Sequence, residues 1–164
     1  MERFVELGFP TTKDEEWRFT NVAPIAKTTF QRPEEPWGMS HAALDTGATN
    51  LTFVNGRFVP ELSRVNPGLR AGSLAEAWRA DPELVERHLA RYAAFDTAAF
   101  VALNTAFTED GAFVRVPRNA VVEQPIHIVH IAGGQVPFVV HPRNLILVGE
   151  SAQVRITETY SGFG

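Results

Sequence analysis

Three histidines are the residues of this chain best suited to bind a metal ion. His127 and His130 are three positions apart, and His141 follows them. Imidazole nitrogens are frequent ligands of zinc and iron, so these side chains are the first candidates for a metal site. Side chains three positions apart on a β-strand, however, point to opposite faces of the sheet. One strand therefore cannot present both His127 and His130 to one metal ion, and we expect the histidines to be solvated or hydrogen-bonded.

Other patterns that could carry chemistry are missing from the sequence. There are no cysteines, which excludes disulfides and thiolate ligands for zinc or an iron–sulfur cluster. Ser151 and Ser161 lack the G-x-S-x-G context of a catalytic serine. Gly133-Gly134 indicates a turn, because no phosphate-binding glycine motif occurs. We therefore assign no catalytic, cofactor-binding or metal-binding residue from these patterns.

The charged and aromatic segment Asp14-Glu15-Glu16-Trp17-Arg18-Phe19 allows two interpretations. In the first, which we favour, it is a solvated turn that Trp17 and Phe19 anchor onto the core. In the second it docks onto a partner, since Trp and Arg are enriched at interface hot spots. Asn104 and Glu109-Asp110-Gly111 are typical of a helix end that leads into a turn.

Length and composition limit the class of protein. At 164 residues the chain suits about one domain with a sizeable core. The net charge of −4 argues against a nucleic-acid-binding protein and against one held on anionic lipid by charge. No apolar run of about 18 residues and no signal-peptide core occurs. We predict a cytoplasmic protein without a membrane span.

The elements of the first half follow from local signals. Residues 1–8 resemble the end of a helix, and Thr12-Lys13-Asp14-Glu15 has the spacing of a capping box that opens a short helical turn. Residues 31–50 are predicted to form a loop, because they contain prolines and glycines and show no periodicity. Residues 51–59 are predicted to form a β-hairpin around Asn55-Gly56, the favoured type I′ pair.

Three helices are predicted next. Ser73 begins a second capping box, and Asp81 can cap the following helix with Pro82 at its first position. Asp96 is predicted to cap the third helix. The apolar stripe of this third helix consists of Phe100, Leu103 and Phe107.

After Asp110-Gly111 the hydrophobic period changes from 3.6 to 2, which indicates strands. The candidate strands are Ala112–Val116, Pro125–Ile131, Val136–Val140, Arg143–Val148 and Gln153–Tyr160. Short strands with turns at nearly regular spacing are typical of a solenoid or a β-sandwich, and periodicity alone does not choose between them.

The last predicted strand is followed only by Ser161-Gly162-Phe163-Gly164, without a capping element. An uncapped array leaves unpaired N–H and C=O groups on an open edge. We therefore expect that a partner covers the edge or that the sequence is the front part of a longer protein, and we favour the second. Such a fragment would tend to self-associate through its edge.

Several short motifs, in order along the chain, resemble one family. The first is Leu7–Asn21, which contains Asp14-Glu15-Glu16-Trp17-Arg18-Phe19-Thr20-Asn21. The others are Ala102–Phe107, Val114–Pro117, Glu123–Ile128, Pro142–Val148, Ala152–Val154 and Glu158–Gly162. Together they resemble the SufB/SufD family of the SUF iron–sulfur cluster assembly machinery, and the first motif resembles its SufD branch.

The resemblance implies an α+β fold with a mainly helical region over residues 1–108, followed by the first turns of a right-handed parallel β-helix over residues 109–164, truncated there. It implies a scaffold subunit, not an enzyme, of a SufB–SufC–SufD complex that builds iron–sulfur clusters. SufB-like and SufC-like subunits would be the partners, and ATP would be used by the SufC-like one, so no cofactor is expected in this chain. The SufC-binding end and the family's important histidine would lie beyond Gly164, so no site residue is carried over.

Two alternatives remain open at this point. A small cupin-like metal-binding enzyme would use scattered histidines and Glu150, but cupins need closely spaced ligands on adjacent strands. A carbohydrate-binding β-solenoid would need aromatic residues along one strand face. The predicted strands carry only Phe113, Phe138 and Tyr160, which is thin support for that role.

Overall fold

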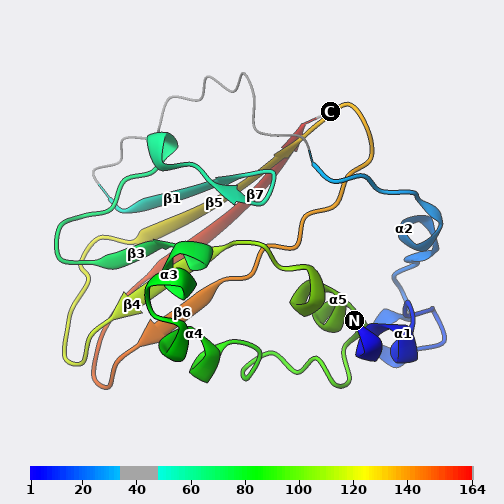
Figure 1. Cartoon of the computed structure of the whole chain (residues 1–164), viewed down its shortest axis with the longest axis horizontal. Helices are drawn as coiled ribbons and strands as arrows, with labels where there is room; N and C mark the ends of the chain where they lie inside the picture. The colour runs from blue at the N-terminus through cyan, green and yellow to red at the C-terminus, as the bar shows by residue number, and fades with distance from the viewer. Residues whose placement is uncertain (34–47, 164) are drawn as a thin grey trace.

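The computed structural model describes residues 1–33 and 48–163 and combines helices with strands, as predicted (Figure 1). Its helices and 3-10 turns are α1 (Glu2–Leu7), η1 (Glu15–Trp17), α2 (Ala23–Lys27), η2 (Pro60–Leu62), α3 (Leu74–Ala80), α4 (Pro82–His88) and α5 (Ala99–Phe107). Its strands are β1 (Asn50–Val54), β2 (Arg57–Phe58), β3 (Arg70–Ser73), β4 (Ala112–Val116), β5 (Ile126–Gly133), β6 (Leu145–Val148) and β7 (Ile156–Phe163). Within the described part, no helix is long and apolar enough to cross a membrane.

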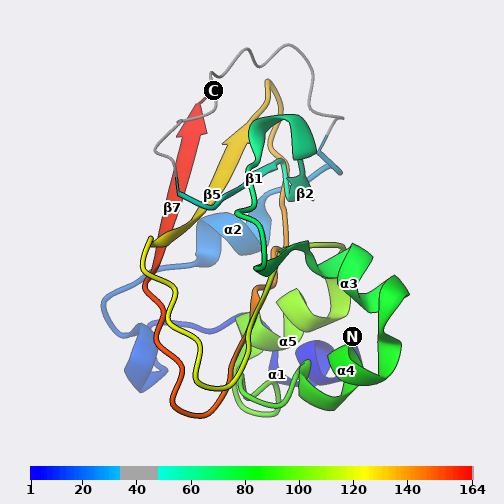
Figure 2. The same cartoon turned by 90° about the vertical axis from the view of Figure 1, so that its left-hand side faces the viewer.

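The strands form two mixed sheets, with the orders β2-β1-β5-β7 and β3-β4-β6. Figure 2 shows the four strands of the first sheet side by side. From β4 onward, successive strands alternate between the two sheets. β4 pairs in parallel with β6, and β5 pairs in parallel with β7. β1 adds to the first sheet in parallel with β5, whereas β3 adds to the second sheet antiparallel to β4.

The main hydrophobic core lies between the two sheets. It consists of the buried side chains of Leu51, Phe53, Ala112, Val114, Val116, Ile126 and Ile128. These residues alternate along β1, β4 and β5, because every second side chain of a strand points to the same face. A second cluster on the other face of the three-stranded sheet packs Phe113 and Leu145 against Leu74 of α3 and Val85 of α4. Each fully buried side chain of this size stabilises the fold by about 1.5–3 kcal/mol.

The local signals for the hairpin and for two helix starts are confirmed. Asn55 and Gly56 both have positive φ, 49° and 81°, as a type I′ turn requires. The Ser73 side chain accepts a hydrogen bond from the Glu76 N–H, and the Asp81 side chain accepts one from the Leu84 N–H. The predicted loop 31–50 falls mostly outside the described residues.

The two other predicted caps are wrong. The capping box expected from Thr12 and Glu15 does not form, because the 3-10 turn η1 begins at Glu15, after Asp14, without a side-chain cap. The Asp14 carboxylate instead accepts hydrogen bonds from the N–H and hydroxyl of Thr11 and closes a turn toward the N-terminus. Helix α5 begins at Ala99, after Ala98, and not next to Asp96. The backbone carbonyl of Asp96 accepts a hydrogen bond from the Arg3 side chain, which ties this stretch to α1 before the helix starts.

One predicted strand is absent and three have shifted ends. Over Val136–Val140 the chain forms no strand, and only Phe138 makes an isolated bridge, with Gln31. Pro137 lies within this stretch and lacks the N–H that a strand needs for its ladder. The strand expected over Pro125–Ile131 is β5, which runs from Ile126 to Gly133. The one expected over Arg143–Val148 is β6, which begins at Leu145, and the one expected over Gln153–Tyr160 is β7, which runs from Ile156 to Phe163.

Asp110, between α5 and β4, connects several of these elements. Its carboxylate accepts hydrogen bonds from the Phe58 N–H, the Ser73 hydroxyl and the Ala75 N–H, at 2.8–3.1 Å. Its backbone carbonyl accepts another from the Arg143 N–H. The hairpin, the start of α3 and the approach to β6 are therefore fixed by one residue.

We expect Asp110→Ala to lower the free energy of unfolding by about 2–4 kcal/mol, because three donors lose a charged acceptor and two of them are backbone N–H groups. Urea unfolding measures this change. The matched control is Asp96→Ala, since Asp96 is exposed and contributes its backbone carbonyl; its effect should stay within about 0.5 kcal/mol. Equal losses in the two variants would contradict the role given to Asp110.

Candidate functional site: an apolar groove beside helix α5

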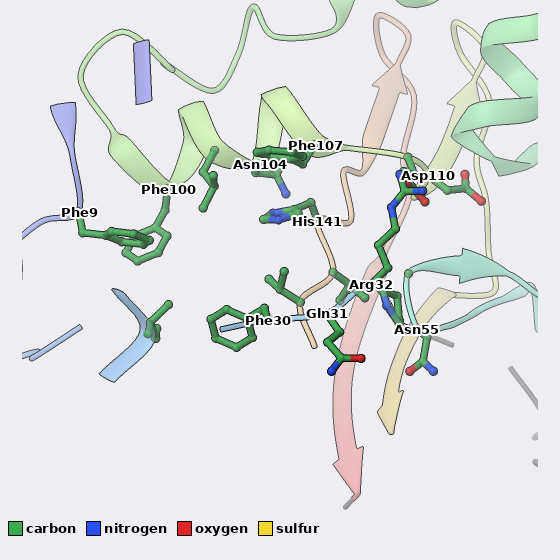
Figure 3. A pocket seen from close by; sticks show the side chains of 17 residues that line it. Phe9, Phe30, Gln31, Arg32, Asn55, Phe100, Asn104, Phe107, Asp110 and His141 are labelled. Atoms are coloured by element: carbon green, nitrogen blue, oxygen red, sulfur yellow. The ribbon is translucent and has the colours of Figure 1, made fainter. Parts of the chain in front are cut away.

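An apolar groove of about 810 Å³ lies beside α5 and is the candidate site of the described part (Figure 3). Its walls come from the N-terminal region, α5, the hairpin turn and the segment before β6. The apolar side chains that line it belong to Phe9, Ile25, Phe30, Pro33, Phe100, Leu103, Phe107, Val139 and Val140. A concave, mostly apolar site of this size is within the range of small-molecule pockets.

Aromatic packing between α1 and α5 builds one wall of the groove. Gly8 has a φ of 67° at the end of α1, which turns the chain so that Phe9 contacts Phe4 at 5.1 Å and Phe100 at 5.9 Å between ring centroids. Trp17 joins this cluster, with its ring centroid 5.1 Å from that of Phe100. The stripe predicted on α5 therefore faces the groove and the N-terminal aromatic residues.

The segment Asp14–Phe19 divides between its two interpretations. Trp17 anchors the turn, as we favoured, but Phe19 is 90% exposed and does not anchor it. The guanidinium of Arg18 lies 4.9 Å from the centre of the Phe19 ring, so these two side chains shield each other at the surface.

Polar groups of the groove mostly hold its walls together. Asn104 donates a hydrogen bond to the Pro142 carbonyl and accepts one from Arg143, which fixes the segment before β6 against α5. The guanidinium of Arg32, which reaches toward the end of α5 in Figure 3, pairs with the Glu109 carboxylate at 2.8 Å. This ion pair is largely exposed, so it contributes at most about 1 kcal/mol.

His141 lies in the groove as a neutral side chain. Its ring stacks on Phe107 at 5.5 Å between centroids, and the two are labelled side by side in Figure 3. Burial lowers the pKa of His141 below its usual value, and the nearby Glu109 carboxylate opposes this shift without reversing it. The imidazole therefore offers the groove a neutral hydrogen-bonding group at pH 7.

The three candidate histidines, His127, His130 and His141, are not brought together. His127 and His130 lie on opposite faces of β5, as the spacing predicts: His127 bonds to the Thr159 hydroxyl at 2.8 Å, whereas His130 is buried on the core side. His141 lies in the groove. Among residues 1–33 and 48–163, no group of three or more His, Cys, Asp or Glu side chains is arranged to hold a metal ion. Ser151 lies in a turn and Ser161 in β7.

His130 belongs to an aromatic stack that crosses the whole four-stranded sheet. The stack consists of Phe58, Phe53, His130 and Tyr160, one residue from each of β2, β1, β5 and β7, in register. Its successive ring centroids are 5.4, 5.0 and 4.9 Å apart. Sequence reasoning did not find this stack, because it depends on strand register.

The groove should bind an uncharged apolar aromatic probe such as N-phenyl-1-naphthylamine. We expect Phe107→Ala to weaken this binding about tenfold, which corresponds to roughly 1.4 kcal/mol and to the loss of one partly buried ring. Fluorescence titration measures the affinity. Val148→Ala is the matched control, because Val148 and Phe107 are both 48% exposed and Val148 does not line the groove. Equal weakening in both variants would show that the probe binds elsewhere.

Comparison with known proteins connects the chain to one family. A family model described as the SufBD protein N-terminal region matches residues 1–128. An iron–sulfur cluster assembly SufBD family protein of Synechocystis is 31% identical over 94% of this chain and 36% of its own length. The iron–sulfur cluster assembly protein SufD of Escherichia coli is 22% identical over 98% of this chain and 37% of its own length. A SufBD family protein of Arabidopsis thaliana is 37% identical over 33% of the chain.

The chain thus spans little more than a third of the length of the two relatives that it matches throughout. The family match covers all the helices of the described part and the strands from β1 to the start of β5. The chain belongs to the SufBD family and corresponds to its N-terminal portion.

Proposed function

We propose that this chain is the N-terminal portion of a non-enzymatic scaffold subunit that assembles iron–sulfur clusters in the cytoplasm together with a SufB-like and a SufC-like subunit. Family membership and the names of the relatives, which are assembly proteins, support this role. The cluster is the cargo of such a complex, and ATP is used by the SufC-like subunit. No residue of this chain is assigned to either.

The observation that carries the proposal is the path of the chain from β4 to β7. Strands that alternate between two sheets, each in parallel with the strand two later, are the arrangement that successive turns of a β-helix produce. We propose that residues 109–164 begin a right-handed parallel β-helix, since parallel crossovers are almost always right-handed. The region 1–108 would then cover its first turn, and β1 and β3 add one strand to each sheet.

The open side of the array offers a place for further strands. β7 pairs with β5 along its whole length, and no other described strand pairs with it. An edge of this length presents a row of N–H and C=O groups to an incoming strand. We propose that a further part of the scaffold or its SufB-like partner occupies this edge, and that the chain alone self-associates there.

Co-purification tests the assembly role. The full-length protein is expressed with the SufB-like and SufC-like subunits of the same organism, and the complex is purified through a tag on the SufC-like subunit. We expect all three subunits to elute together from size exclusion, because the scaffold role requires a stable complex. Recovery of the SufB-like and SufC-like subunits without this protein would overturn the proposal.

Metal content of the purified chain distinguishes the scaffold from a cupin-like metal enzyme. The scaffold role predicts no stoichiometric iron, manganese or zinc after dialysis, measured by inductively coupled plasma mass spectrometry. One tightly held metal ion per chain that is lost in His127→Ala or His130→Ala would favour the metal enzyme instead.

A further inference from the structure

Four large apolar side chains that stay exposed in the fold meet in the groove beside α5. They are Ile25, Phe30, Phe107 and Val139, which are 36–48% exposed. These residues come from four segments far apart in the sequence, so the fold itself brings them together. Single exposed apolar residues are common, but a concave cluster of them marks a surface that binds an apolar group.

The groove is aromatic at one end and polar at the other. Figure 3 shows the rings of Phe9 and Phe100 together at one end, and Arg32 and Asp110 at the other. His141 lies between the two ends. A ligand that fills the groove therefore needs an apolar ring system and a polar group on one side.

The charged side chains of the polar end are already engaged within the fold. Arg32 pairs with Glu109 at 2.8 Å, and the Asp110 carboxylate accepts three hydrogen bonds from other parts of the chain. A charged ligand would be attracted by one member of the Arg32–Glu109 pair and repelled by the other, so its charge would add little to binding. The groove therefore favours an uncharged ligand.

His141 is a polar group of the groove that a ligand can still use. The Asn104 amide is engaged by the segment before β6, whereas the nitrogens of the His141 ring have no hydrogen-bond partner among the described residues. The Thr108 hydroxyl donates a hydrogen bond to the His141 carbonyl, and the His141 ring stacks on Phe107, so the imidazole is held in place. Burial lowers the pKa of His141, and a neutral imidazole has one nitrogen that accepts a hydrogen bond.

We propose that the groove binds an uncharged aromatic molecule of two or more rings that carries a hydroxyl group: its rings lie against Phe30 and Phe100, and its hydroxyl donates a hydrogen bond to the His141 ring. The groove volume of about 810 Å³ suits a ligand of this class. A phenolic O–H donates and a neutral imidazole accepts, so the pairing needs no charge on either side. This binding is separate from the assembly role, so the failure of one leaves the other standing.

Displacement of N-phenyl-1-naphthylamine from the full-length protein tests the contact with two probes of similar shape, 2-naphthol and 2-methylnaphthalene. His141→Phe keeps a ring on Phe107 but cannot accept a hydrogen bond. We expect it to bind 2-naphthol about fivefold more weakly and 2-methylnaphthalene within about twofold of the wild type, because one neutral hydrogen bond is lost. His127→Phe, outside the groove, should change neither affinity. Equal effects of His141→Phe on both probes, or no displacement by 2-naphthol, would overturn the proposal.

If His141→Phe does not fold, photolabelling of the wild-type protein decides the question. The probe 4-hydroxybenzophenone is an uncharged aromatic phenol that attaches to nearby C–H groups under ultraviolet light. Mass spectrometry should find the label on peptides that contain Leu103, Val139 or Val140, which line the groove, and an excess of 2-naphthol should suppress it. Labelling confined to other peptides, or labelling that 2-naphthol does not reduce, would refute the site.

Discussion

The carboxylate of Asp110 holds together parts of the chain that would otherwise be free to separate. Its two oxygens accept hydrogen bonds from β2, from the end of β3 and from the first turn of α3. Hydrogen bonds to a charged acceptor are about twice as strong as neutral ones, and a half-buried setting strengthens them further. Asp110 lies between α5, which forms a wall of the groove, and β4. Its side chain therefore links that wall to β2 of the first sheet and to β3 of the second.

Close backbone contact is the second constraint. At Gly111, a Cβ atom would lie 2.0 Å from the Arg143 carbonyl oxygen, and at Gly149 one would lie 2.5 Å from the Arg118 nitrogen. At both corners the returning chain rests directly on the chain below it. Backbone hydrogen bonds from Arg143 to Asp110 and from Gly149 to Val116 use this proximity. Glycine at these corners lets each strand pair in parallel without a gap.

Local structure could be predicted from the sequence where a few neighbouring residues decide it. Asn55 and Gly56 adopt the positive φ of the hairpin turn themselves. Ser73 and Asp81 cap their helices with their own side chains. Asp96 failed as a cap because a contact with Arg3 from the distant α1 competes for that stretch. Of the groove, only the apolar stripe on α5 could be predicted from the sequence. Its other lining residues, such as Phe9, Phe30 and Val139, come from segments far apart in the chain. The strand period predicted that His127 and His130 lie on opposite faces, but the aromatic stack around His130 depends on the register of four strands.

The order of the strands has a consequence for synthesis on the ribosome. β1 leaves the ribosome with β2, but the strand that pairs with its other side is β5, which follows three helices and β4. The apolar strand β1 therefore waits with one unpaired side while the intervening chain is made. Contacts between distant segments form slowly, and unpaired strand edges in partly folded chains promote aggregation. The hairpin turn gives β1 an early partner on one side, and the emergence of β5 ends its exposure on the other.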